Sequence, residues 1–116
     1  MKIEEKVPTL EQCKRLVELG VNTETERFWY TDEDGLNLSR YDYWMLMLPG
    51  PRYAAPDVAE LGELLPNIRI ERTSGLWWYY YIKPRDSIYS VRKFHTEAQA
   101  RAAALIWLIE NGYLTI

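Results

Sequence analysis

Apolar residues recur at helical spacing in three segments, and the first of these predicted helices lies near the start of the chain. Thr9 is placed to cap it, and Gln12, three residues later, completes a capping box. Gly20 gives the helix a natural end. The buried face of this helix is expected to hold Leu10, Cys13, Leu16 and Val17.

The other two predicted helices lie in the middle and at the end of the chain. The middle one is short, begins at Pro56, ends at Leu65 and has a leucine-rich face. The last one starts after Thr96, with Gln99 at the capping-box position, and ends at Gly112. Because it is apolar almost all round between 102 and 109, we expect it to be covered on more than one side.

Strand-forming residues occupy the segments between the helices. The acidic stretch from Asp32 to Gly35 predicts a hairpin turn, and Ser74-Gly75 predicts another. The expected strands are Arg27–Thr31, Tyr41–Leu48, Ile68–Thr73, Leu76–Lys83 and Ile88–Phe94. The last three of these are expected to form an antiparallel meander.

These elements predict an α+β fold with an antiparallel sheet of about four to five strands. We expect the first and last helices to pack on one sheet face, and the short middle helix to bridge two sheet segments or cover an edge. Helices on both faces are the alternative, because the strand 76–83 is apolar on both sides. A single domain is expected over residues 1–116, with 1–8 flexible.

Composition narrows the class of protein. The one cysteine, Cys13, allows no intramolecular disulfide, which fits a reducing compartment and a cytoplasmic protein. The N-terminal segment carries acids and lacks an apolar core, so it does not resemble a signal peptide. The longest apolar run, 102–109, is too short to span a membrane.

Charge is unevenly distributed along the chain. The net charge is −3, but residues 1–66 hold seven Lys or Arg against thirteen Asp or Glu. Residues 67–101 hold seven against three, so this later part is locally basic within an acidic protein. A nucleic-acid-binding domain that acts through charge is usually basic overall, so this asymmetry alone indicates little.

Three strings of the sequence carry a resemblance to a known family: LEQCKRLVELGV (10–21), AAPDVAELGELLP (54–66) and EAQARAAALIWLIENGYL (97–114). In order and spacing they resemble a family of small proteins encoded by gut Bacteroides and by phages and prophages of such hosts. That family has no assigned activity, so the resemblance implies a phage-associated origin and carries no functional residue.

No residue pattern in the chain predicts catalysis, a metal site or a cofactor. His95 is the only histidine, and a general base needs partners to orient it. Cys13 has the phase of a small core residue. The acidic residues 32–34 lack the spacing of a calcium loop, and no phosphate-binding or dinucleotide motif is present.

The strand LWWYYYIK is the feature most open to a functional interpretation. Strand alternation places Trp77, Tyr79 and Tyr81 on one side. If the helices cover the other side, these rings are presented to solvent near Arg85 and Lys93. We take these five as candidate binding residues, with Trp29 or Trp44 as additions. Plain packing of the rings is the simpler alternative.

The leading hypothesis is a non-enzymatic protein-interaction domain that uses this aromatic face, since Tyr and Trp are enriched in protein interfaces. Self-association as a homodimer is included, because the last helix has more apolar surface than one sheet face needs. The second hypothesis is an accessory binder of single-stranded nucleic acid, with bases stacked on the rings. The third is a small enzyme that uses His95.

Overall fold

The computed structural model describes residues 6–21, 25, 27–32, 35–40, 52–65, 68–82, 87–89 and 92–115. Within them the chain forms, in order, α1 (Leu10–Glu18), β1 (Arg27–Asp32), β2 (Gly35–Arg40), β3 (Tyr53–Ala54), α2 (Val58–Leu64), β4 (Ile68–Thr73), β5 (Leu76–Ile82), β6 (Ser87–Tyr89) and α3 (Glu97–Glu110). The predicted α+β class is confirmed.

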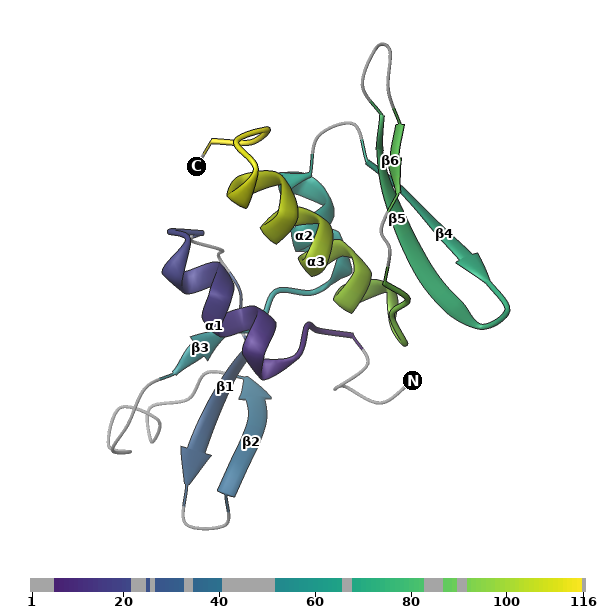
Figure 1. The fold of residues 1–116 in the computed structure, drawn as a ribbon. Helices are drawn as coiled ribbons and strands as arrows, with labels where there is room; N and C mark the ends of the chain where they lie inside the picture. Colours follow the sequence, from purple (N-terminus) through teal and green to yellow (C-terminus); the bar gives the residue numbers. More distant parts are fainter. Residues whose placement is uncertain are drawn as a thin grey trace.

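The described strands form two separate antiparallel sheets, where the sequence predicted one of about four to five strands. Sheet A has the order β2-β1-β3, and sheet B has the order β4-β5-β6. Figure 1 shows the helices in the middle of the molecule, with the two sheets at opposite ends. Sheet B is the predicted meander of three consecutive strands.

The first and last helices do not share a sheet face, which corrects the predicted arrangement. Helix α3 lies against β4 and β5 of sheet B, whereas α1 contacts β3 of sheet A. The two helices also pack on each other, and α2 packs on α3. Helix α3 is therefore covered on several sides, as its apolar sequence predicts.

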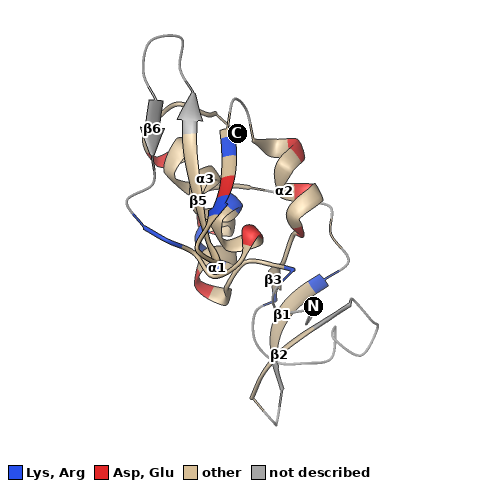
Figure 2. Ribbon diagram, turned by 90° about the vertical axis from the view of Figure 1, so that its right-hand side faces the viewer, with Lys and Arg blue, Asp and Glu red and all other residues tan. Residues whose placement is uncertain are grey.

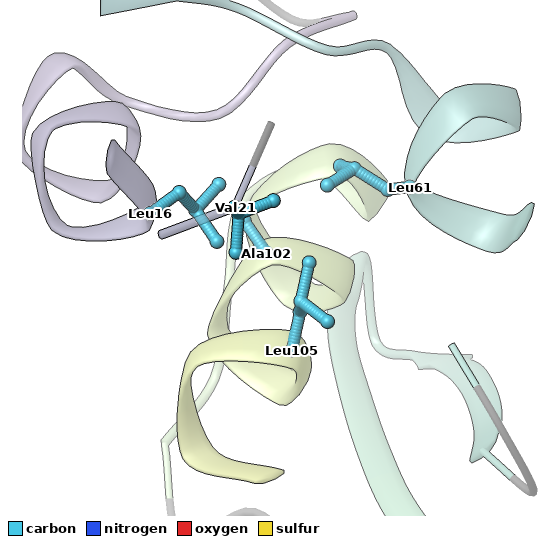
Figure 3. Packing of buried hydrophobic residues seen from close by; sticks show 5 residues of the cluster. All are labelled: Leu16, Val21, Leu61, Ala102 and Leu105. Atoms are coloured by element: carbon cyan, nitrogen blue, oxygen red, sulfur yellow. The ribbon is translucent and has the colours of Figure 1, made fainter. Parts of the chain in front are cut away.

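One core cluster joins all three helices. Leu61 of α2 and Leu105 of α3 are completely buried, and Leu16 of α1 is 3% exposed. Figure 3 shows these side chains converging with Val21 and Ala102. This cluster fixes α1 relative to α3, and that relation determines the candidate site described below.

A second cluster lies beneath sheet B, where Tyr79 and Phe94 pack on the small residues Ala100 and Ala104 of α3. A third cluster anchors the start of the chain. It includes Val7, which is completely buried together with Pro8. The segment expected to be flexible, 1–8, thus has its last two residues packed against the domain.

The predicted helix ends are largely confirmed. Thr9 and Gln12 form a complete capping box on α1. Thr96 caps α3, but the Gln99 side chain accepts from the N–H of His95 and so does not complete a box. Helix α2 starts at Val58, after Asp57 as N-cap, two residues later than the Pro56 start that was predicted.

The first hairpin differs from its prediction in its second strand. Asp32 pairs with Gly35, so β2 starts at Gly35 rather than at Tyr41. The predicted strand Tyr41–Leu48 lies outside the described residues.

The turn between β4 and β5 provides a test of the sheet B register. Ser74 and Gly75 both have positive φ, 54° and 78°, as in the type I′ turn that favours Asn-Gly. We expect Ser74→Asn to stabilise the protein by about 0.5 kcal/mol and Gly75→Ala to destabilise it by about 1 kcal/mol. Urea denaturation checks both values, and equal effects of the two substitutions would contradict the turn type.

None of the described helices has the length and apolar character needed to cross a membrane.

Candidate functional site

A groove of about 630 Å³ lies between α1, α3 and segment 92–95, which lies between β6 and α3. The N-terminal end of α1 forms one wall, and segment 92–95 forms the opposite wall. Its lining residues are Thr9, Glu11, Gln12, Tyr79, Arg92, Lys93, Phe94, His95, Gln99, Ala103, Ile106, Trp107 and Glu110. The groove brings apolar and charged side chains together in one concavity, which makes it the first candidate for a binding site.

The α1 wall of the groove is held on α3 by bonds between distant parts of the chain. The Gln12 side chain donates to the backbone oxygen of Gln99, 2.9 Å away, which links the first turns of α1 and α3. Arg15 pairs with Glu110 at 2.9 Å, which links the two helices further along. The groove is therefore part of the folded scaffold rather than a loop feature.

Segment 92–95 continues the edge of sheet B next to β5. Phe94 exchanges both backbone hydrogen bonds with Trp77, at 2.8 and 2.9 Å. The same pairing sets Lys93 opposite Trp78, and the Lys93 ammonium lies 5.2 Å from the centroid of the Trp78 ring. Lys93 therefore lies on the sheet face away from α3, and Phe94 lies on the face toward it.

The floor of the groove is apolar and partly aromatic. Ala103, Ile106 and Trp107 of α3 are half-buried, beside the ring of Tyr79. The Trp107 ring stacks on Tyr113 with a centroid distance of 5.3 Å. A half-buried floor of this kind offers apolar area that a ligand can cover.

Charges of opposite sign line the two walls. Segment 92–95 carries Arg92, Lys93 and His95, all exposed, and Figure 2 shows Lys and Arg on this segment after β6. The helices contribute Glu11 and Glu110 on the other side. The rim therefore combines positive and negative groups, in contrast to a uniformly basic channel.

The pKa of the Tyr79 hydroxyl depends on its burial and on nearby charged residues of the groove. Burial raises the pKa of Tyr79, the nearby charge of Arg92 lowers it, and Glu110 raises it. The net direction is upward, so the phenol stays neutral and remains a hydrogen-bond donor at ordinary pH. It adds one polar group to an otherwise apolar floor.

Among the five predicted binding residues, the groove brings together Tyr79 and Lys93. Trp77 lies on the same sheet face and packs on the cluster beneath sheet B without lining the groove. Tyr81 lies in β5, where its backbone pairs with Ile68 of β4. Arg85 lies outside the described residues.

The side of β5 that was expected to be exposed is the side that α3 covers. Tyr79 is only 7% exposed and packs on Phe94, Ala100 and Ala104, so an open aromatic face through Tyr79 is wrong. The sequence could not decide this point, because both faces of the strand are aromatic. Of the two suggested additions, Trp29 donates to the oxygen of Pro8 at 3.2 Å, and Trp44 lies outside the described residues.

The opposite face of sheet B carries cations that contact aromatic rings. Arg69 donates to the Tyr80 hydroxyl at 2.6 Å and lies 5.8 Å from its ring centroid. Tyr80 is 6% exposed, and Glu71 lies beside both groups. With its central ring covered, this face offers little stacking surface for a nucleic-acid base.

Groups for acid–base or metal chemistry are sparse in the described residues. The His95 side chain is exposed and has no hydrogen-bonding or ion-pair partner within the described part of the chain. Across the same residues, no group of three or more His, Cys, Asp or Glu is arranged to hold a metal ion.

Cys13 is buried and does not line the groove, and its burial predicts that the stability of the protein depends on pH. Burial raises the pKa of the Cys13 thiol to about 12, against a smaller lowering by its hydrogen bond with Trp29. The unfolded chain loses this proton near pH 9 while the folded protein keeps it, so stability falls as pH rises above 9. Urea denaturation at pH 8 and pH 11 should show a larger loss for the wild type than for Cys13→Ala. Equal losses of stability in the two proteins would show that folding does not keep the Cys13 thiol protonated.

Several groove residues were not predicted from the sequence. Gln12 was predicted only as part of a cap, Ile106 and Trp107 were predicted only as part of the apolar last helix, and Glu11 was assigned no role. The sequence did contain one signal for this floor. A helix that is apolar all round has more apolar surface than one contact covers, and Trp107 is part of the surface that stays half-exposed. Only the tertiary structure shows which surface remains.

Comparisons with protein-family models, with curated proteins and with solved structures find no match to this chain.

Proposed function

We propose that this protein is a non-enzymatic interaction domain that binds a short peptide segment of a partner protein in the groove between α1, α3 and segment 92–95. The observation that carries the proposal is the combination of an apolar floor with a rim of both charge signs. Peptides present apolar and charged side chains in close alternation, so they complement such a lining.

The dimensions of the groove support a short ligand. Its α3 side extends from Gln99 to Glu110, which is roughly 16 Å at about 1.5 Å per helical residue. An extended peptide of about five residues covers that length at about 3.3 Å per residue. The resemblance to phage-encoded proteins suggests a phage or host protein inside the host cell as the source of this segment.

A single-stranded nucleic acid fits the groove less well. Arg92 and Lys93 are placed to attract phosphates, but Glu11 lines the same space and repels a polyanion. Glu110, which is paired with Arg15, adds no attraction for one. A protein segment that carries both signs of charge avoids this repulsion. The charges of the rim therefore favour a protein partner.

The proposal can be tested by selecting ligands from a displayed library of random heptapeptides and measuring affinities by calorimetry. Ala103→Gln extends a side chain into the groove while keeping a good helix former in α3. We expect this variant to weaken binding of the selected peptides about tenfold, which corresponds to about 1.4 kcal/mol. The matched control Ala103→Ser adds one small atom and should bind within about twofold of wild type.

Two outcomes would count against a peptide-binding groove. Selected peptides that bind Ala103→Gln as tightly as wild type would place the binding surface elsewhere. Failure to enrich any peptide, together with salt-dependent quenching of Trp fluorescence by single-stranded DNA, would favour the nucleic-acid alternative.

A further inference from the structure

We infer that the peptide binds by strand addition, pairing its backbone with Lys93 at the edge of sheet B, and that it carries an acidic residue between two apolar ones. This inference rests on the proposed function, because it specifies the binding mode and the ligand class of the same groove. It is carried by the backbone pairing of segment 92–95.

The backbone groups of Phe94 and Lys93 face opposite ways. Phe94 points both its N–H and its C=O at Trp77 of β5. In an extended chain the neighbouring residue points these groups the opposite way, so those of Lys93 face away from β5. Within the described residues, the N–H and C=O of Lys93 form no hydrogen bond.

The edge of sheet B formed by segment 92–95 borders the groove. Lys93 lines the groove, whereas no residue of β4, the strand at the other edge of sheet B, lines it. An unpaired donor and acceptor at a sheet edge are a template for a strand from another chain. Strand addition is an established mode of peptide recognition.

Pairing with Lys93 determines on which face of sheet B each side chain of the added strand lies. A residue paired directly with Lys93 has its side chain on the same face as the Lys93 ammonium, which lies over Trp78. Charge complementarity selects Asp or Glu at this position. The residues on either side of it point to the opposite face, toward Ile106 and Trp107, and are expected to be apolar.

The charge of the opposite wall agrees with this assignment. Glu110 is already paired with Arg15, so it does not require a cation from the ligand. The acid of the peptide lies on the far side of the added strand, away from α3, beside the Lys93 ammonium. The predicted ligand class is thus an extended apolar–acidic–apolar segment.

The test uses a capped probe peptide, acetyl-Ser-Thr-Phe-Glu-Phe-Thr-Ser-amide, and hydrogen exchange of the ¹⁵N-labelled full chain. The Lys93 amide should exchange freely without peptide and become protected when the probe binds. Methylating the backbone nitrogen of the central Glu removes the donor to the Lys93 carbonyl, and we expect about tenfold weaker binding.

A charge-reversal cycle tests the side-chain register. Lys93→Glu should weaken binding of the probe peptide by about fivefold. Replacing the central Glu of the probe with Lys should restore most of the lost affinity for this variant. Lys14→Glu, which alters an exposed lysine on α1 outside the groove lining, is the matched control and should change affinity by less than twofold.

The outcomes separate the binding mode from the proposed function. Binding that shifts the Trp107 signals but leaves the Lys93 amide unprotected would overturn strand addition and retain a peptide-binding groove. Library peptides that bind in the groove while the probe does not would overturn the apolar–acidic–apolar ligand class. If neither the probe nor any library peptide binds, the proposed function itself fails.

Discussion

Replacing Leu105 with alanine is expected to destabilise the protein by about 3 kcal/mol, the largest effect on folding among the substitutions considered. Leu105 is completely buried in the cluster that joins α1, α2 and α3. Truncation removes apolar burial and leaves a cavity, which costs about 2–5 kcal/mol for a core leucine. Because a domain of this size has a total stability of about 5–15 kcal/mol, the midpoint of urea denaturation should fall markedly.

Val17→Ala is the matched control for this prediction. Val17 was expected in the core from its helical phase, but it is 48% exposed. Alanine also has the higher helix propensity, so the change should be within about 0.5 kcal/mol of neutral. Equal losses at Leu105 and Val17 would contradict the position of the core.

Replacing Trp107 with alanine is expected to weaken peptide binding by about thirtyfold, the largest effect on function. Trp107 provides the largest ring of the groove floor and is held by its stacking on Tyr113. Buried tryptophans are the residues that most often dominate a binding interface, with losses of about 2 kcal/mol or more on truncation. Calorimetric titration with a selected peptide measures this effect.

The control for Trp107 must distinguish a lost contact from a disturbed fold. Leu36→Ala removes a side chain that is 51% exposed on β2 of sheet A, at the other end of the molecule (Figure 1). It should leave peptide affinity unchanged. Both variants should keep the far-ultraviolet circular dichroism of wild type, and unchanged affinity in folded Trp107→Ala would exclude Trp107 from the site.

Local sequence signals were sufficient to predict most of the elements. The capping residues Thr9 and Thr96 mark the starts of α1 and α3, because a cap acts within one turn. The turn at Ser74-Gly75 marks the hairpin of β4 and β5, because only a few residue types accept positive φ. Each of these signals depends on residues that are close in the sequence.

Where two local patterns were equally good, the sequence could not choose between them. Both faces of β5 are aromatic, so the position of α3 alone decides that Tyr79 is covered. The return strand of the first hairpin was likewise assigned to Tyr41–Leu48, the more apolar segment, whereas β2 begins at Gly35. A weakly apolar strand such as β2 is specified by its turn and its partner.

The groove depends on contacts between residues far apart in the sequence. The bond from Gln12 to Gln99 spans 87 positions. Leu16 and Leu105, which belong to the same two helices, lie in one core cluster. Neither contact leaves a local pattern in the sequence. Lys93 was proposed for its charge, but its position at the groove follows only from the pairing of Phe94 with Trp77.

The most direct test of the peptide-binding groove is a two-dimensional ¹H–¹⁵N NMR titration of the full chain with a selected peptide. We predict saturable shifts of the Trp107 indole and of the amides of residues 92–95, with the signals of β1 and β2 unchanged. Saturable shifts confined to sheet A, with segment 92–95 and Trp107 unaffected, would contradict the assignment of the groove as the binding site.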